Sequence, residues 1–104
     1  MTGVATWVGN ADFQKGIDSG KVADFNVCFG TSISAPPSAT DINTINGIIA
    51  DLNSGKLSIK DSKAWGDAQK KYQDAVKNWN KPDPKKAGQK FSDMLGKLAK
   101  AHGC

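Results

Sequence analysis

The sequence predicts a single α+β domain that is mostly helical, in which a short N-terminal strand region packs on three amphipathic helices. Apolar and polar residues alternate with a period of two in residues 22–29, whereas apolar residues recur every three or four positions from residue 41 onward. A length of 104 residues is typical of one domain, so residues 1–104 are treated as a single unit. We expect residues 1–39 to be extended and rich in loops, and residues 40–104 to be helical.

The first third of the chain is expected to be extended or irregular. A short apolar segment covers residues 4–8, and Asn10 is placed to cap one brief helical turn. Residues 22–29 alternate clearly and predict a half-buried strand. The two faces of this strand are Ala23, Phe25, Val27 and Phe29 on one side and Asp24, Asn26 and Cys28 on the other. Residues 30–39 then have the Gly, Ser and Pro content of a loop.

The first helix is expected over residues 41–53, where isoleucine and leucine repeat at intervals of three and four. Thr40 or Asp41 is placed to cap its start, and Gly55 is placed to end it. Reciprocal capping by a Glu side chain is not expected, because the chain contains no Glu. Residues 56–60 alternate again and are interpreted as a short strand.

The last two helices are predicted by longer apolar series. One begins at Asp61 or Ser62 and ends at Asn80, and the other begins after Asp83 and ends at Gly103. Their apolar positions are Trp65, Ala68, Tyr72, Ala75 and Trp79 in the first and Ala87, Phe91, Met94, Leu95, Leu98 and Ala101 in the second. Because so few residues separate the two helices, we expect an antiparallel helical hairpin.

Charge in this chain comes from lysine and aspartate alone, since Arg and Glu are both missing. Arg supplies the planar fork that reads guanine edges, so sequence-specific nucleic-acid binding is not expected. Residues 1–53 hold two Lys and five Asp, a charge of −3, and residues 54–104 hold twelve Lys and five Asp, a charge of +7, which together give the net +4. This asymmetry favours contact with an anionic surface or association between copies of the chain.

The last predicted helix carries a stripe of positive charge. The stripe consists of Lys86, Lys90, Asp93, Lys97 and Lys100, with Lys85 alongside. Apolar residues lie opposite it, which is the pattern of a basic amphipathic helix that binds acidic lipid or polysaccharide. The alternative is that the apolar face is core and the lysines are only solvated. The preceding helix differs, because its stripe of Lys63, Asp67, Lys70, Asp74 and Lys77 neutralises itself.

Three aromatic residues, Trp65, Tyr72 and Trp79, lie seven positions apart on the second long helix. On one helix face they would form a platform for sugar rings, bases or a partner helix. The alternative is that they belong to the core, with Trp79 partly exposed at an interface. We keep all three as candidate binding residues.

The two cysteines, Cys28 and Cys104, are 76 positions apart. They are candidates for a disulfide bridge, which would require an oxidising compartment; the alternative is two free thiols. No secretory signal is visible in residues 1–10, so export would require that a signal was removed or that the route needs none. We expect a secreted, extracellular protein.

Catalytic and metal-binding patterns are poor. The one histidine, His102, lies two residues from Cys104 near the chain end, where no third group is available to orient it. No zinc, calcium, phosphate-loop or dinucleotide pattern is present, so no catalytic residue, metal or cofactor is assigned, and no transmembrane segment is expected.

The function predicted from these patterns is that of a small non-enzymatic binding protein, effector-like or toxin-like. It would engage an anionic surface through Lys85, Lys86, Lys90, Lys97 and Lys100. The alternative is a structural subunit of an extracellular filament or particle coat, in which opposed charges join copies of the chain into a homo-oligomer.

Overall fold

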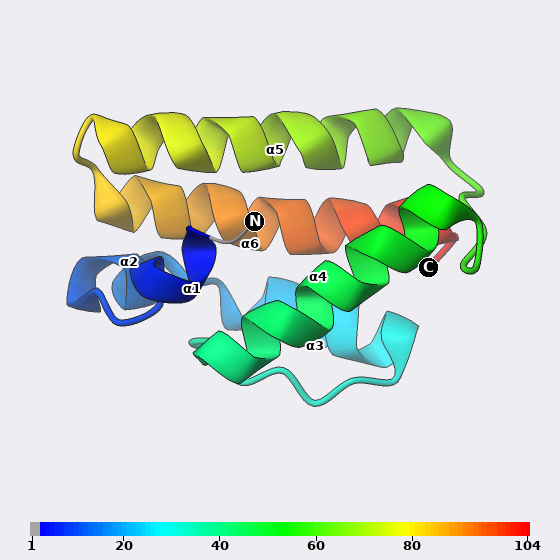
Figure 1. Ribbon diagram of the computed structural model, residues 1–104, viewed down its shortest axis with the longest axis horizontal. Coiled ribbons are helices and arrows are strands. Elements are labelled where there is room, and N and C mark those ends of the chain that lie inside the picture. Colours follow the sequence, from blue (N-terminus) through cyan, green and yellow to red (C-terminus); the bar gives the residue numbers. More distant parts are fainter. Residues whose placement is uncertain (1–2) are drawn as a thin grey trace.

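A computed structural model of the chain describes residues 3–104, and that range contains helices and turns but no strand (Figure 1). The helices are α1 (Val4–Trp7), α2 (Ala11–Gly16), α3 (Ser19–Phe29), α4 (Ala39–Ser54), α5 (Ser62–Asn80) and α6 (Pro84–His102). The predicted α+β class is therefore wrong, and the described chain is one small, compact, all-helical domain. The described part of residues 1–39, expected to be extended, holds three of the helices.

Helix α6 is the centre of the molecule. It runs antiparallel to α5 in a helical hairpin, and α2 and α3 pack against it from the other side (Figure 1). Its apolar side chains Ala87, Phe91, Met94, Leu95, Leu98 and Ala101 are at most 2 % exposed. Helix α4 crosses in front of this layer and contributes buried isoleucine and leucine to the same core (Figure 1). The 3.6-residue apolar period of α6 therefore buries one continuous face.

The predicted strand lies within helix α3. The Asp18 side chain caps the start of α3, and Gly30, with a φ of 66°, ends it in the left-handed region that favours glycine. Val22 and Phe25, three positions apart, are buried at 2 % and 0 % exposure, whereas Val27, expected to face inward, is 87 % exposed. The alternating segment therefore also contains two apolar residues at a helical interval, Val22 and Phe25. Asp18 and Gly30 at its two ends favour the helix.

Two further segments predicted to be extended also differ from the structure. Residues 4–8 contain helix α1. Residues 56–60 form bends and irregular loop and not a strand, and residues 3–104 contain no strand that could pair with their backbone groups. Instead, the N–H groups of Lys60 and Asp61 donate to the carbonyl oxygen of Ala101, at 2.8 and 3.1 Å, and hold this loop on the end of α6.

Polar caps set the starts of α2 and α4. Asn10 caps α2 as predicted, its Oδ1 accepting from backbone N–H groups in the first turn. Helix α4 begins two residues earlier than predicted, because Ser38 is its N-cap. The Ser38 Oγ accepts from the Asp41 N–H and the Asp41 carboxylate accepts from the Ser38 N–H, at 3.1 and 2.9 Å. Reciprocal capping therefore does occur, with Asp in the position where Glu is usual.

Helices α2 and α6 approach each other very closely. A Cβ atom on Gly88 would collide with the carbonyl oxygen of Phe13, and one on Gly16 would collide with the carbonyl oxygen of Lys85. The buried Ser92 of α6 adds polar contacts here: its Oγ accepts from the Asp18 N–H at 2.9 Å and donates to the Gly88 carbonyl at 3.0 Å. These contacts fix α2 and the start of α3 on α6.

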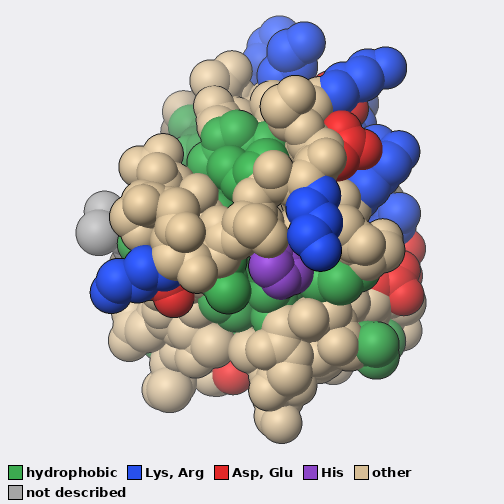
Figure 2. Space-filling view, turned by 90° about the vertical axis from the view of Figure 1, so that its right-hand side faces the viewer, with side chains coloured by type: hydrophobic (Ala, Val, Ile, Leu, Met, Phe, Trp, Pro, Cys, Tyr) green, Lys and Arg blue, Asp and Glu red, His purple; other side chains and the backbone are tan. Residues whose placement is uncertain are grey.

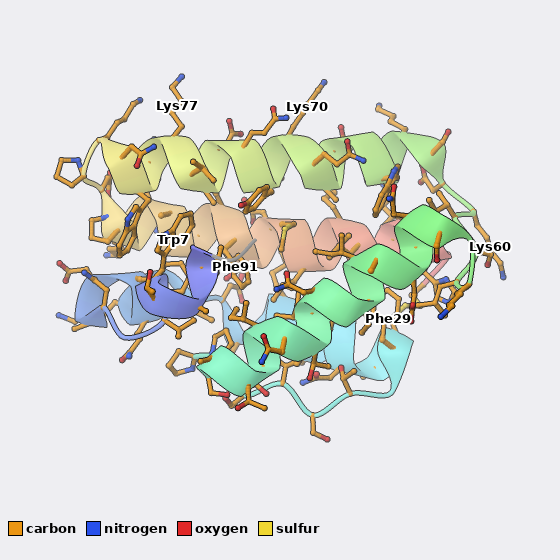
Figure 3. All side chains as sticks on the ribbon, viewed as in Figure 1. Trp7, Phe29, Lys60, Lys70, Lys77 and Phe91 are labelled. Atoms are coloured by element: carbon orange, nitrogen blue, oxygen red, sulfur yellow. A yellow bond between two sulfur atoms is a disulfide. The ribbon has the colours of Figure 1, made fainter. Side chains whose placement is uncertain are left out.

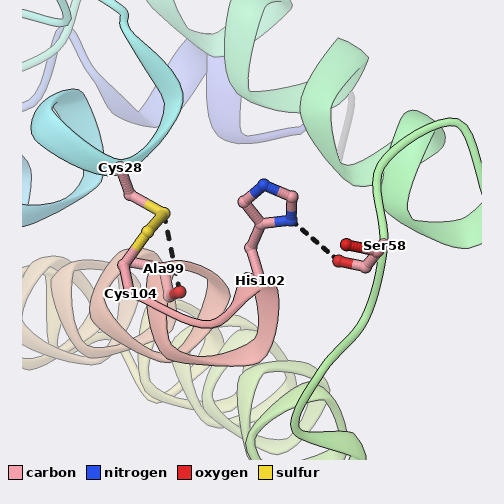
Figure 4. Close-up of a disulfide and its surroundings, with 5 residues drawn as sticks. All are labelled: Cys28, Ser58, Ala99, His102 and Cys104. Atoms are coloured by element: carbon pink, nitrogen blue, oxygen red, sulfur yellow. Dashed lines mark hydrogen bonds between the residues drawn. A yellow bond between two sulfur atoms is a disulfide. The ribbon is translucent and has the colours of Figure 1, made fainter.

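Cys28 and Cys104 form the predicted disulfide, with their Cα atoms 5.8 Å apart (Figure 4). The bridge joins the end of α6 to the last turn of α3. Next to it, His102 Nδ1 lies 2.7 Å from the carbonyl oxygen of Ser58, and the imidazole stacks on the Phe29 ring with 5.3 Å between centroids. The C-terminal turn is thus held by a covalent bond, a hydrogen bond and an aromatic contact.

Candidate functional site

A hollow between α3, α5 and α6 gathers lysine side chains from all three helices. Its lining consists of Lys21, Lys71, Asp93, Gly96, Lys97 and Lys100, and its volume is about 310 Å³. We call it the lysine hollow. Four ammonium groups and one carboxylate give the lining a net charge of +3. Residues that are far apart in the sequence therefore produce one concentrated positive site.

Ion pairing leaves most of this positive charge uncompensated. Lys71 Nζ lies 4.0 Å from Asp93 Oδ2, and this is the one ion pair within residues 3–104. Both side chains are about one-third exposed, so the pair contributes little to stability. Gly96 leaves room beside it for the stem of Lys21, whose Cδ would lie 3.0 Å from a Cβ at this position. Three of the four lysines thus have no carboxylate within 4 Å in the described chain.

The five lysines predicted as binding residues do not all meet. Lys97 and Lys100 line the lysine hollow, whereas Lys85, Lys86 and Lys90 lie toward the other end of α6, outside it. Figure 2 shows lysine side chains gathered along the upper and right-hand edges of one end of the molecule. The apolar face of α6 is buried in the core, so the folded chain presents only the charged side of this helix.

Lys21 and Lys71 of the lysine hollow were not among the binding residues predicted from the sequence. Lys71 follows Lys70 but stands outside the alternating ladder of α5, which is a signal that it faces a different neighbour. Lys21 was assigned to an extended region, and only the helical form of α3 brings it beside Gly96.

The outer stripe of α5 is the counterpart of the lysine hollow. Lys70 and Lys77 project from α5 away from the rest of the molecule (Figure 3). Along the sequence they alternate with Asp67 and Asp74 at helical intervals of three and four. Together with Lys63 this stripe has three Lys and two Asp, a net charge of +1 against +3 for the lysine hollow, which makes it a natural control surface.

The three aromatic residues of α5 have two different environments. Trp79 stacks on Trp7 of α1, with ring centroids 5.0 Å apart and planes at 12°, and forms a T-shaped contact with Phe13, with centroids 6.3 Å apart. Trp65 and Tyr72 instead line an apolar groove of about 330 Å³ between α4 and α5. The rest of its lining is Ile49, Ala68, Gln69, Gln73, Met94 and Leu98. We call it the aromatic groove; Trp79 is not part of it.

No group of three His, Cys or Asp side chains within residues 3–104 is arranged to hold a metal ion. Cys104 is bound in the disulfide and His102 is engaged with Ser58, so neither is placed to act as a nucleophile or base for the other. Among the described helices, none has the length and apolar character required to cross a bilayer.

Comparison of the chain with protein-family models, with curated protein sequences and with solved structures finds no match.

Proposed function

We propose that this protein is a small secreted binding protein, without enzymatic activity, that attaches to an anionic surface through the lysine hollow. The observation that carries the proposal is the convergence of Lys21, Lys71, Lys97 and Lys100 on one hollow that contains a single carboxylate. Acidic lipid headgroups and acidic polysaccharides share the required chemistry, which is closely spaced negative charge.

The choice of lysine indicates what kind of anion is bound. A lysine ammonium is a mobile point charge, whereas geometrically specific recognition of phosphate or carboxylate generally uses the planar fork of Arg, which is absent here. Because the four lysines line one hollow of about 310 Å³, we expect their charges to act together over a screening length of about 8 Å at physiological salt. We therefore infer attraction to a dense anionic surface, with a steep dependence on salt.

An extracellular location is supported by the disulfide between Cys28 and Cys104. Disulfides persist in oxidising compartments and are reduced in most cytosolic environments. We therefore infer that the anionic surface bound by this protein lies outside the cell.

The proposal is tested with phosphatidylcholine vesicles containing or lacking phosphatidylglycerol, and with a heparin column as the polysaccharide arm. Each lysine near an acidic membrane contributes about 1 kcal/mol, so the double variant Lys97→Gln/Lys100→Gln should bind acidic vesicles at least tenfold more weakly. The matched control, Lys63→Gln/Lys70→Gln, loses the same charge from the outer stripe of α5 and should bind within about twofold of the wild type.

Binding to vesicles alone would identify lipid as the surface, and retention on heparin alone would identify polysaccharide. Equal loss in both double variants would mean that only overall charge matters, and the lysine hollow would then not be the site. Failure of the wild-type protein to bind either material at low salt would overturn the function itself.

A further inference from the structure

We propose that the aromatic groove is a second, independent binding site, which takes a small uncharged molecule with a flat apolar body and one hydrogen-bonding group. It lies between α4 and α5 with α6 behind, and is lined by different residues from the lysine hollow. The two sites therefore bind different chemistry.

The groove is built by two helix faces and the core beneath them. On α5, Trp65, Ala68 and Tyr72 follow one another at intervals of three and four, and Ile49 faces them from α4. Ala68 lies between the two aromatic residues along this face of α5 and contributes only a methyl group to the lining. At about 330 Å³, the groove falls within the size range of pockets that hold small ligands, about 300 to 1,000 Å³.

Charge decides the class of ligand. No Lys or Asp lines this groove or the hollow that continues from it along α4, although charged residues make up 23 % of the chain. The continuing hollow, about 470 Å³, is lined by Asn46, Ile49, Ala50, Asn53, Trp65 and Gln69. An ionised ligand would lose the hydration of its charge here and would find no opposite charge to replace it. A neutral ligand does not carry this cost. The groove is therefore complementary to an uncharged molecule.

Two amide side chains lie on the solvent side of the groove. Gln69 and Gln73 are exposed, and each amide offers both donors and acceptors. Trp65 and Tyr72 are half-buried and add flat apolar area to the walls. Such an arrangement holds the apolar body of a ligand between the aromatic walls and Met94, with its hydrogen-bonding group toward the amides.

The test uses N-phenyl-1-naphthylamine, a neutral fluorescent probe, and 8-anilinonaphthalene-1-sulfonate, which has nearly the same body and a negative charge. The neutral probe should bind the folded protein at a ratio of one to one, with a saturable rise in fluorescence. Gln69→Trp, which places a large ring in the groove from an exposed position, and Trp65→Ala, which removes one wall, should each weaken binding at least tenfold. Thr44→Trp, on an exposed face of α4 away from the groove, is the control and should leave binding unchanged.

Circular dichroism establishes that each variant is folded before its binding is compared. The proposal is overturned if the neutral probe shows no saturable binding up to its solubility limit, or if Gln69→Trp and Trp65→Ala bind it as tightly as the control. Displacement of the neutral probe by an equal concentration of the sulfonate would overturn the inference that the ligand is uncharged.

Discussion

The effect of a Gly-to-Ala substitution on stability depends on what surrounds the added Cβ atom, as one glycine in α6 and one in α5 show. Gly88 faces the backbone of α2, where a Cβ would collide with the Phe13 carbonyl, whereas nothing lies within 4 Å of a Cβ on Gly66. Both lie inside long helices, where Ala is favoured over Gly by about 0.8–1.0 kcal/mol. The neighbouring backbone therefore decides the sign of the two substitutions.

We predict that Gly88→Ala destabilises the protein by about 2 kcal/mol, because α2 must move and the fully buried Phe13 loses packing. Gly66→Ala should instead stabilise it by about 0.5–1 kcal/mol. Urea unfolding of both variants measures the two changes. A stabilising Gly88→Ala would show that α2 does not lie against α6 as described.

Asp41 gives the stability of α4 a dependence on pH. Burial raises the pKa of its carboxyl group, but hydrogen bonds from Ser38 and Ser34 outweigh burial, so the pKa lies below its ordinary value. A folded pKa below the unfolded one means that the stabilisation is fully present above the unfolded value, about 3.9. It is lost as the pH falls through the folded pKa.

We therefore expect Asp41→Asn to lower the free energy of unfolding by about 1 kcal/mol at pH 7, because the variant loses the charged acceptor of the capping box. The difference from the wild type should shrink as the pH falls below about 4, where the carboxyl group of the unfolded chain is protonated first. It should be smallest below the folded pKa, where the carboxylate of the folded protein is protonated as well. Thermal unfolding measured at a series of pH values checks this. A difference that stays constant down to pH 2 would contradict the described role of the carboxylate.

At the scale of elements, the helices with long apolar series are the ones that the sequence predicts correctly. The apolar series of α5 and α6 each run over about four turns and fit only a helix, so both helices and their antiparallel hairpin were predictable from sequence. Helix α3 was not predictable in this way, because its 11 residues fit both the two-residue period of a strand and the three-residue interval of a helix. The signals in the sequence that favour a helix here are Asp18 as the N-cap and Gly30 as the residue that ends it.

The disulfide links two elements that are otherwise distant in sequence. It closes a loop with a sequence separation of 76, which restricts the unfolded chain by about 4–5 kcal/mol in the entropic model. The double variant Cys28→Ser/Cys104→Ser should therefore lose about 2–5 kcal/mol of stability in urea unfolding. Amide hydrogen exchange should also quicken at Lys60 and Asp61, because their acceptor, the Ala101 carbonyl, lies in the turn that the bridge holds.

A loss below about 1 kcal/mol in the double variant would show that the unfolded chain is already restricted without the bridge. Unchanged exchange at Lys60 and Asp61 would show that hydrogen bonding and the Phe29–His102 stack alone hold the end of α6.

At the scale of the whole molecule, the sequence indicated the sign of the candidate site but not its place. The positive stripe of α6 was visible from spacing alone, and it led to Lys97 and Lys100. The contributions of Lys21 and Lys71 depend on which helices flank α6, which is information about packing and not about spacing. The different environments of Trp79 and of Trp65 and Tyr72 could not be predicted for the same reason. The three residues are evenly spaced in the sequence, and only tertiary contacts place Trp79 outside the aromatic groove.

The most direct test of anion binding at the lysine hollow is a two-dimensional NMR titration of the isotope-labelled protein. The first titrant is small bicelles that contain phosphatidylglycerol, and the second is acidic heparin fragments. Anion binding at the lysine hollow predicts that the earliest and largest amide shifts occur at Lys21, Lys71, Gly96, Lys97 and Lys100, and that they disappear as salt is raised. The largest shifts on the outer stripe of α5 or on α1 and α2, or no shifts with either titrant, would contradict it.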